Sequence, residues 1–314
     1  MLKKQIKVRV PATSGNLGSG FDALGIALTL YNTIELFCEK KTVKNQDRKH
    51  LLTIEIKGEG KGSLPEDESN VVWQGIQKVL KKKGFPIQSF SFYLKLENKI
   101  PLAKGLGSSA GARVGGILAG NGLFKHFLNQ KEILNLAAAM EGHPDNAAPA
   151  VMGGLVASCL VDGEVQAIKL NPQRELCAVV CLPDFELSTE KARKILPSHV
   201  SREDAVFNLQ RTALFLASFS TKNFSCLKEA MQDRLHQDYR KKLIPGFDQV
   251  IKNGYDQGAL GMALSGAGPS VLAFAYPKNA KKVGEAMEKG FLKYGKKASS
   301  FILDFDFKGA QSLC

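Results

Sequence analysis

The most distinctive motif of the chain reads Pro101-Leu102-Ala103-Lys104-Gly105-Leu106-Gly107-Ser108-Ser109-Ala110-Gly111. It follows a strand-like run at residues 90–96 and precedes an apolar, glycine- and alanine-rich run at residues 109–124 that is typical of a helix. Because glycine lacks a Cβ atom, this backbone can approach a ligand closely, and the free amides of a helix N-terminus favour negative charge. The motif is therefore suited to phosphate, although the residues alone leave an ordinary strand-to-helix turn open.

Two other glycine-rich stretches accompany this motif. Residues 11–22 read Pro-Ala-Thr-Ser-Gly-Asn-Leu-Gly-Ser-Gly-Phe-Asp, and residues 265–270 read Ser-Gly-Ala-Gly-Pro-Ser. The central motif has neither the Gly-Lys-Ser/Thr ending of a P-loop nor the Gly-x-Gly-x-x-Gly pattern of a dinucleotide site. Instead, the three stretches together resemble the GHMP small-molecule kinases, named for galactokinase, homoserine kinase, mevalonate kinase and phosphomevalonate kinase. The residues of these stretches and their order along the chain are most similar to those of the homoserine kinases of that family, over nearly the whole chain.

The resemblance implies an α+β fold with two packed lobes. The N-terminal lobe, residues 1–155, would resemble domain 2 of ribosomal protein S5, and the C-terminal lobe, residues 156–314, would be an α+β lobe of ferredoxin-like type. The active site is then expected in the cleft between them.

Hydrophobic periodicity and turn residues predict the individual elements. Strands are expected at residues 5–10, 31–39, 51–57, 90–96, 154–161, 164–170, 176–182, 259–265, 271–276 and 299–305. Helices are expected at residues 71–84, 109–124, 131–141, 189–196, 201–220, 224–235, 247–257 and 278–294. Asn70 and Ser188 are the predicted N-caps of two helices, Pro144 is expected to begin another, and the polar run 40–49 is expected to be a loop.

In the GHMP family the central motif binds ATP, so the resemblance assigns the whole stretch to the nucleotide. Backbone amides and the hydroxyls of Ser108 and Ser109 would hold the phosphates, with Lys104 as a further cation. Ser109 is taken as a magnesium ligand. Family members carry a second ligand, a glutamate, eight positions before a histidine, and Asn135 stands there in this chain; Glu132 or Glu141 could substitute from a shifted register. Arg113 occupies a position where a small residue is common, and it could contact phosphate or crowd the helix.

Homoserine is a zwitterion with a side-chain hydroxyl, so its site needs charges of both signs. Arginine suits carboxylates because two donors match two oxygens. By similarity, Asp22 binds the ammonium group, and Arg193 and Arg240 bind the carboxylate. The catalytic group implied by the resemblance is His143, Asp145 and Asn146, with Asn146 orienting the hydroxyl and no dedicated base. The full expected substrate site is Asn16, Asp22, His143, Asp145, Thr189, Arg193, Arg240 and Gly266.

The reaction implied is the ATP-dependent phosphorylation of L-homoserine to O-phospho-L-homoserine, with release of ADP, in threonine biosynthesis. One alternative is a GHMP kinase for another small alcohol. Another is a catalytically weak regulator that binds ATP or an amino acid, which Asn135 in place of the glutamate favours.

Composition and charge indicate which partners and which cellular location to expect. The chain has 314 residues, 44% of them hydrophobic, and a net charge of +13 that is spread over scattered lysine clusters, so no nucleic-acid partner is expected. Its most apolar stretch, residues 147–161, is interrupted by Pro149 and is too short to span a bilayer, so no membrane association is expected. Cys177 and Cys181 share one face of a strand-like run, which predicts buried thiols and a reducing, cytoplasmic location. A monomer and a homodimer both stay open.

Overall fold

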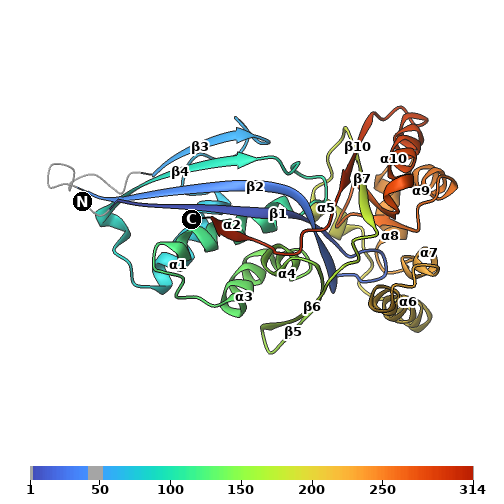
Figure 1. Ribbon diagram of the computed structural model, residues 1–314, viewed down its shortest axis with the longest axis horizontal. Helices are drawn as coiled ribbons and strands as arrows, with labels where there is room; N and C mark the ends of the chain where they lie inside the picture. The colour runs from blue at the N-terminus through green and yellow to red at the C-terminus, as the bar shows by residue number, and fades with distance from the viewer. Residues whose placement is uncertain (1–2, 42–51, 314) are drawn as a thin grey trace.

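Two sheets organise the chain in the computed structural model, which describes residues 3–41 and 52–313 (Figure 1). The seven strands of the first sheet are β1 (Lys3–Gly15), β2 (Leu24–Lys40), β3 (Leu52–Gly58), β4 (Phe90–Asn98), β5 (Leu155–Val161), β6 (Glu164–Leu170) and β11 (Gln311–Leu313). The four strands of the second sheet are β7 (Cys177–Pro183), β8 (Gly261–Leu264), β9 (Val271–Ala275) and β10 (Ala298–Leu303).

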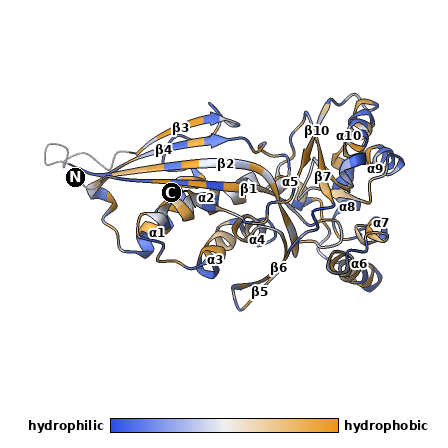
Figure 2. Cartoon of the chain, in the orientation of Figure 1, coloured by the Kyte–Doolittle hydropathy of each residue, from blue (hydrophilic) through white to orange (hydrophobic). Residues whose placement is uncertain are grey.

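The first sheet has the strand order β11-β1-β2-β4-β3, and β5 pairs with both β2 and β6. Hydrophobic and hydrophilic residues alternate along its long strands, as Figure 2 shows, because one face is buried. Four helices cover that face (Figure 1): α1 (Val71–Lys82), α2 (Ser108–Gly122), α3 (Gln130–Glu141) and α4 (Ala147–Met152). Helices α1 and α2 pack closely because a Cβ atom at Gly116 would lie only 2.1 Å from the carbonyl oxygen of Val72.

The second sheet is antiparallel and has the order β10-β7-β9-β8. With α9 (Phe247–Asp256) and α10 (Pro277–Leu292), its strands follow the βαββαβ succession of a ferredoxin-like lobe, as expected from the sequence. The remaining helical segments are η2 (Ile87–Ser89), α5 (Thr189–Lys194), α6 (Arg202–Thr221), α7 (Leu227–Ala230), α8 (Gln237–Arg240) and η3 (Lys241–Leu243).

Within the second sheet, β7 is buried on both faces. Cys177, Val179 and Cys181 pack in the core shared with α9 and α10, whereas the alternate residues pack in a second core with Phe215 of α6 and Leu24 of β2. That second core joins the two sheets. Cys177 and Cys181 are buried free thiols, as predicted, and burial raises the pKa of both.

Most predicted elements are present with small shifts at their ends, and both predicted N-caps are confirmed. The side chains of Asn70 and Ser188 accept hydrogen bonds from the amides of Val72 and Lys191, at 3.0 and 3.2 Å. The strand β11, the extension of β1 over residues 11–15 and the extension of β2 over residues 24–30 were not predicted. Most of the expected loop at residues 40–49 lies outside the described residues.

Two helix predictions are wrong. Only Leu227–Ala230 is helical within residues 224–235, because the Asp233 carboxylate accepts hydrogen bonds from the amides of residues 235, 236 and 237 and forms a turn. The helix expected from Pro144 begins at Ala147 instead, with Asn146 at its N-cap position.

The lobe boundary at residues 155 and 156 stays a prediction, and β5, β6 and β11 all belong to the first sheet. Among the helices of residues 3–41 and 52–313, none combines the length and the apolar character that a membrane span needs.

Candidate active site

The glycine-rich loop joins β4 to α2 and needs its glycines for space. Gly105 and Gly107 have φ angles of 75° and 66°, and Gly107 is the N-cap of α2. A Cβ atom at Gly107 would lie 1.9 Å from Thr13 Oγ1, and one at Gly105 would lie 2.0 Å from the carbonyl oxygen of Ser265. A larger residue at either position would therefore push the loop away from its neighbours.

Hydrogen bonds bring the three glycine-rich stretches to one place. Ser265 Oγ lies 2.7 Å from the carbonyl oxygen of Gly105 and 2.9 Å from Ser14 Oγ. The Asn16 side chain donates to the carbonyl oxygen of Gly266 at 2.8 Å and accepts from the Asp22 amide at 3.0 Å. The loop between β1 and β2 is thus fixed against the turn after β8.

The segment after α3 contributes a network of polar side chains. His143 Nδ1 forms a short hydrogen bond with Asp145 Oδ1, and Asn146 donates to the other oxygen of Asp145 at 3.2 Å. Thr13 donates to Asn146 Oδ1 at 2.9 Å, which fixes the orientation of the amide. Burial lowers the pKa of His143, but the hydrogen bond to Asp145 and its negative charge outweigh burial, so the pKa is raised above its ordinary 6.5.

The two arginines come from the second half of the chain and differ in their partners. Arg193 of α5 donates to both carboxylate oxygens of Asp22, at 2.8 and 3.2 Å. The groups expected to bind the two charges of a zwitterion therefore contact each other in this structure. Ligand atoms of Asp22, His143 and Asp145 lie within 4.8 Å of one another, which concentrates negative charge beside Arg193.

Arg240 of α8 is buried. Its Nε donates to the carbonyl oxygen of Ala192 at 3.1 Å, and one terminal nitrogen donates to His236 Nδ1 at 3.2 Å. Burial lowers the pKa of His236, and its ring lies 2.8 Å from the carbonyl oxygen of Gly18 through Nε2. Burial and the nearby Arg193 lower the pKa of Arg240 to about 10, so it keeps its charge at neutral pH.

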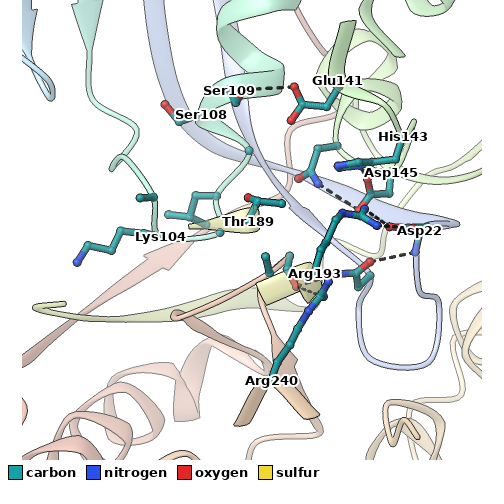
Figure 3. A pocket seen from close by; sticks show the side chains of 18 of the residues that line it. Asp22, Lys104, Ser108, Ser109, Glu141, His143, Asp145, Thr189, Arg193 and Arg240 are labelled. Atoms are coloured by element: carbon teal, nitrogen blue, oxygen red, sulfur yellow. Dashed lines mark hydrogen bonds and ion pairs between the residues drawn. The ribbon is translucent and has the colours of Figure 1, made fainter. Parts of the chain in front are cut away.

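One pocket collects nearly all of the predicted site residues (Figure 3). It is lined by Asn16, Asp22, Pro101, Ala103, Lys104, Gly105, Leu106, Gly107, Ser108, Ser109, His143, Asp145, Asn146, Thr189, Arg193, Arg240 and Gly266. Four predicted residues do not line it: Leu102, Ala110, Gly111 and Asn135. Two lining residues were not among the assigned site residues, Glu141 and Ala267; the second lies inside the glycine-rich stretch 265–270 that pointed to it.

Lys104 lies at the pocket but binds elsewhere. Its ammonium group donates to the carbonyl oxygens of Pro183 and Phe185, at 2.8 and 2.7 Å, and points away from the arginines in Figure 3. Burial lowers the pKa of this group. In this structure Lys104 therefore connects the glycine-rich loop to the end of β7 rather than facing a phosphate position.

The expected metal ligands are separated. Asn135 accepts a hydrogen bond from the Val165 amide at 2.8 Å, on the side of α3 that faces β6. Glu141, at the C-terminal end of the same helix, lies beside Ser109 of α2, with 3.3 Å between Ser109 Oγ and Glu141 Oε2 (Figure 3). Glu132 instead forms a capping box with Asn129. Of the three candidates, Glu141 is the one that the fold brings to Ser109.

Comparison with known proteins identifies the family. Residues 70–154 match the GHMP kinases N terminal domain, and residues 215–293 match the GHMP kinases C terminal domain. The chain belongs to the GHMP kinase family. Homoserine kinases from Desulfitobacterium hafniense and Persephonella marina are each 42% identical to this GHMP kinase. The matches cover 97% and 98% of this chain and 99% and 98% of those proteins.

Solved structures of relatives have the same fold. The homoserine kinase from Cytophaga hutchinsonii superimposes with a TM-score of 0.88 at 33% identity, covering 100% of this chain and 98% of that one. The galactokinase from Lactococcus lactis, complexed with galactose, gives a TM-score of 0.70 at 14% identity over 99% of this chain and 95% of that one. The predicted family and two-lobed GHMP kinase fold are confirmed.

Proposed function

We propose that this GHMP kinase transfers the γ-phosphoryl group of ATP to the side-chain hydroxyl of L-homoserine, forming O-phospho-L-homoserine and ADP. The observation that carries the proposal is that one pocket joins a helix N-terminus suited to phosphates to a partly buried cluster of carboxylates and arginines suited to an amino acid. The full-length resemblance to homoserine kinases supports it. The step belongs to threonine biosynthesis, and we assign it to the cytoplasm, where buried thiols such as Cys177 stay reduced.

The nucleotide half of the pocket is the loop before α2. Its backbone amides, the N-terminal end of the α2 dipole, and the hydroxyls of Ser108 and Ser109 would hold the phosphates of ATP. Ser109 and Glu141 would hold Mg²⁺, because a carboxylate and a hydroxyl are the oxygen donors that this cation prefers. Bound Mg²⁺ supplies positive charge that neutralises the phosphates during transfer.

The acceptor half recognises the two charges of the substrate. Asp22 would bind the ammonium group, and Arg193 and Arg240 would bind the carboxylate through paired donors. Asn146 would orient the hydroxyl, with His143 and Asp145 fixing the position of that amide; Asn16, Thr189 and Gly266 complete the pocket wall. Phosphoryl transfer depends mainly on alignment and charge stabilisation, so we assign no dedicated base, and the proton of the hydroxyl passes to phosphate.

The alternative of a catalytically weak regulator has lost its main support. It depended on Asn135 standing where a glutamate ligand was expected, and Glu141 now occupies the place beside Ser109. A kinase for a different alcohol remains the relevant competitor.

An ADP-release assay tests the proposal directly. Purified protein is assayed with MgATP and L-homoserine, L-serine, L-threonine, mevalonate or galactose as the acceptor. We expect turnover chiefly with L-homoserine, because only an amino acid satisfies both Asp22 and the arginines, and because serine and threonine place the hydroxyl closer to the charged groups. Preferred turnover of mevalonate or galactose would refute the proposal.

A further inference from the structure

Arg113 connects the two residues that would hold the metal. It lies in α2 four residues after Ser109, so both side chains emerge on the same face of the helix. One terminal nitrogen of Arg113 donates both to Ser109 Oγ and to Glu141 Oε2. The side chains of Arg113 and Glu141 are only 20% and 14% exposed, so this ion pair is partly shielded from water.

The two oxygens bound by Arg113 already have a spacing that suits a metal. Adjacent ligands of an octahedral Mg²⁺ at 2.0–2.1 Å lie about 2.9 Å apart. Ser109 Oγ and Glu141 Oε2 are 3.3 Å apart, although they come from two different helices. The residues present therefore fit the metal that the family implies, and in this structure Arg113 donates to both of them.

The same contacts put Arg113 in conflict with the metal. A cation that binds both oxygens has to share them with the Arg113 nitrogen, which already donates a hydrogen bond to each. Two positive charges at this separation also repel each other strongly in a partly buried site. Mg²⁺ and the two hydrogen bonds of Arg113 therefore oppose each other at this pair.

We propose that Arg113 competes with Mg²⁺ for Ser109 and Glu141, so that metal binding displaces its guanidinium group. The inference deepens the proposed function, because it concerns the metal of the same phosphoryl-transfer site. Arginine suits this role because one nitrogen offers two donors on a long, flexible side chain that can withdraw.

A metal titration tests the competition without any acceptor. Mn²⁺ replaces Mg²⁺ as the probe, a non-hydrolysable ATP analogue saturates the protein, and free Mn²⁺ is counted by electron paramagnetic resonance. We expect Arg113→Gln to tighten Mn²⁺ binding about tenfold, the factor associated with one charge-assisted hydrogen bond that no longer has to break. Arg113→Lys, which keeps the charge but loses the planar fork, should tighten binding less. Unchanged or weaker Mn²⁺ binding in Arg113→Gln would overturn the inference.

Two controls separate a specific contact from a general charge effect. In a Glu141→Gln background, which removes the shared partner, Arg113→Gln should no longer tighten Mn²⁺ binding. Arg202→Gln removes the same charge from the exposed start of α6 and should leave Mn²⁺ affinity unchanged. Equal tightening in Arg202→Gln, or tightening that persists without Glu141, would overturn the inference. Thermal melting confirms that each variant is folded.

The outcome is distinguishable from that of the proposed function. If the wild-type protein fails to phosphorylate L-homoserine while Arg113→Gln still tightens Mn²⁺ binding, the proposed substrate is wrong and the role of Arg113 stands. If the wild-type protein phosphorylates L-homoserine but Arg113→Gln does not tighten Mn²⁺ binding, the proposed function stands and the proposed role of Arg113 is wrong.

Discussion

Charged side chains in the pocket are arranged in pairs. Asp22 contacts Arg193, and Asp145 contacts His143, while Arg240 is held by carbonyl oxygens and a neutral imidazole. A zwitterion carries one charge of each sign, so it can enter the Asp22–Arg193 pair and replace each partner with an equivalent one. A neutral alcohol that separated Asp22 from Arg193 would leave both charges without compensation, which is costly for partly buried charges. Charge pairing thus favours an amino-acid substrate at the level of single residues.

The pH dependence of stability tests the His143–Asp145 pair. The pKa of His143 is raised in the folded protein above its ordinary 6.5, so the folded state binds this proton more tightly than the unfolded state. The stabilisation from this pair is complete below pH 6.5 and is lost as the pH rises through the folded pKa. We therefore expect His143→Gln to lower the melting temperature more at about pH 5.5 than at about pH 8.5.

Melting curves of wild type and variant across this pH range give the difference in their melting temperatures. The contributions of the other titrating groups cancel in this difference. His199→Gln, at an exposed position away from the pocket, serves as the control with which the difference for His143→Gln is compared. A difference for His143→Gln that is constant, or that grows with pH, would contradict the assigned role of the pair.

At the scale of elements, the glycine-rich loop can be tested with a matched pair of glycines. Gly107 and Gly84 have nearly equal φ angles, 66° and 67°, but only Gly107 has a neighbour that a Cβ atom would strike. Alanine at either position costs about 1 kcal/mol for the left-handed backbone. We expect only Gly107→Ala to weaken ATP binding as well, by at least about tenfold, because the loop must move away from Thr13.

Calorimetric titration with an ATP analogue measures both variants. If Gly107→Ala binds the nucleotide as tightly as Gly84→Ala does, the loop before α2 is not the phosphate site.

The sequence predicted elements well where one face is buried and the pattern is periodic, as in β4 and α1. It failed at residues 224–235, whose apolar residues suggest a helix, because one side chain, Asp233, takes over three backbone amides. Such a local competition depends on the orientation of a single carboxylate. The strand β11 was missed because its pairing with β1 joins residues about three hundred positions apart.

The site was predicted from motifs. Its one wrongly assigned metal ligand, Asn135, shows the limit of assigning a residue by its distance in sequence from a motif. Asn135 and Glu141 are six residues apart in α3, which places them about 120° apart around the helix. Counting back from His143 therefore selects the side that packs on β6, whereas the end of the helix faces Ser109. Only the folded arrangement distinguishes the two.

At the scale of the whole molecule, Lys104 links the glycine-rich loop to the second sheet. The sequence suggested a phosphate contact, whereas the structure shows two hydrogen bonds to carbonyl oxygens at and just beyond the end of β7. We expect Lys104→Met to lower the melting temperature by about 2 °C or more, since hydrogen bonds of charged groups contribute about 1.5–3 kcal/mol. Affinity for an ATP analogue should change less than about twofold.

Lys61→Met provides the matched control, because Lys61 is exposed and lies outside the pocket. A large loss of nucleotide affinity in Lys104→Met with unchanged melting would show that Lys104 binds phosphate instead.

Steady-state kinetics with three acceptors tests the central claim, that the pocket selects a zwitterionic alcohol. L-homoserine is compared with 4-hydroxybutanoate, which lacks the ammonium group, and with 3-aminopropan-1-ol, which lacks the carboxylate; both keep the hydroxyl at the same chain position. We predict that kcat/KM for L-homoserine exceeds that for each analogue by at least about 100-fold, because each analogue leaves Asp22 or the arginines unpaired. Comparable kcat/KM for either analogue would contradict the claim.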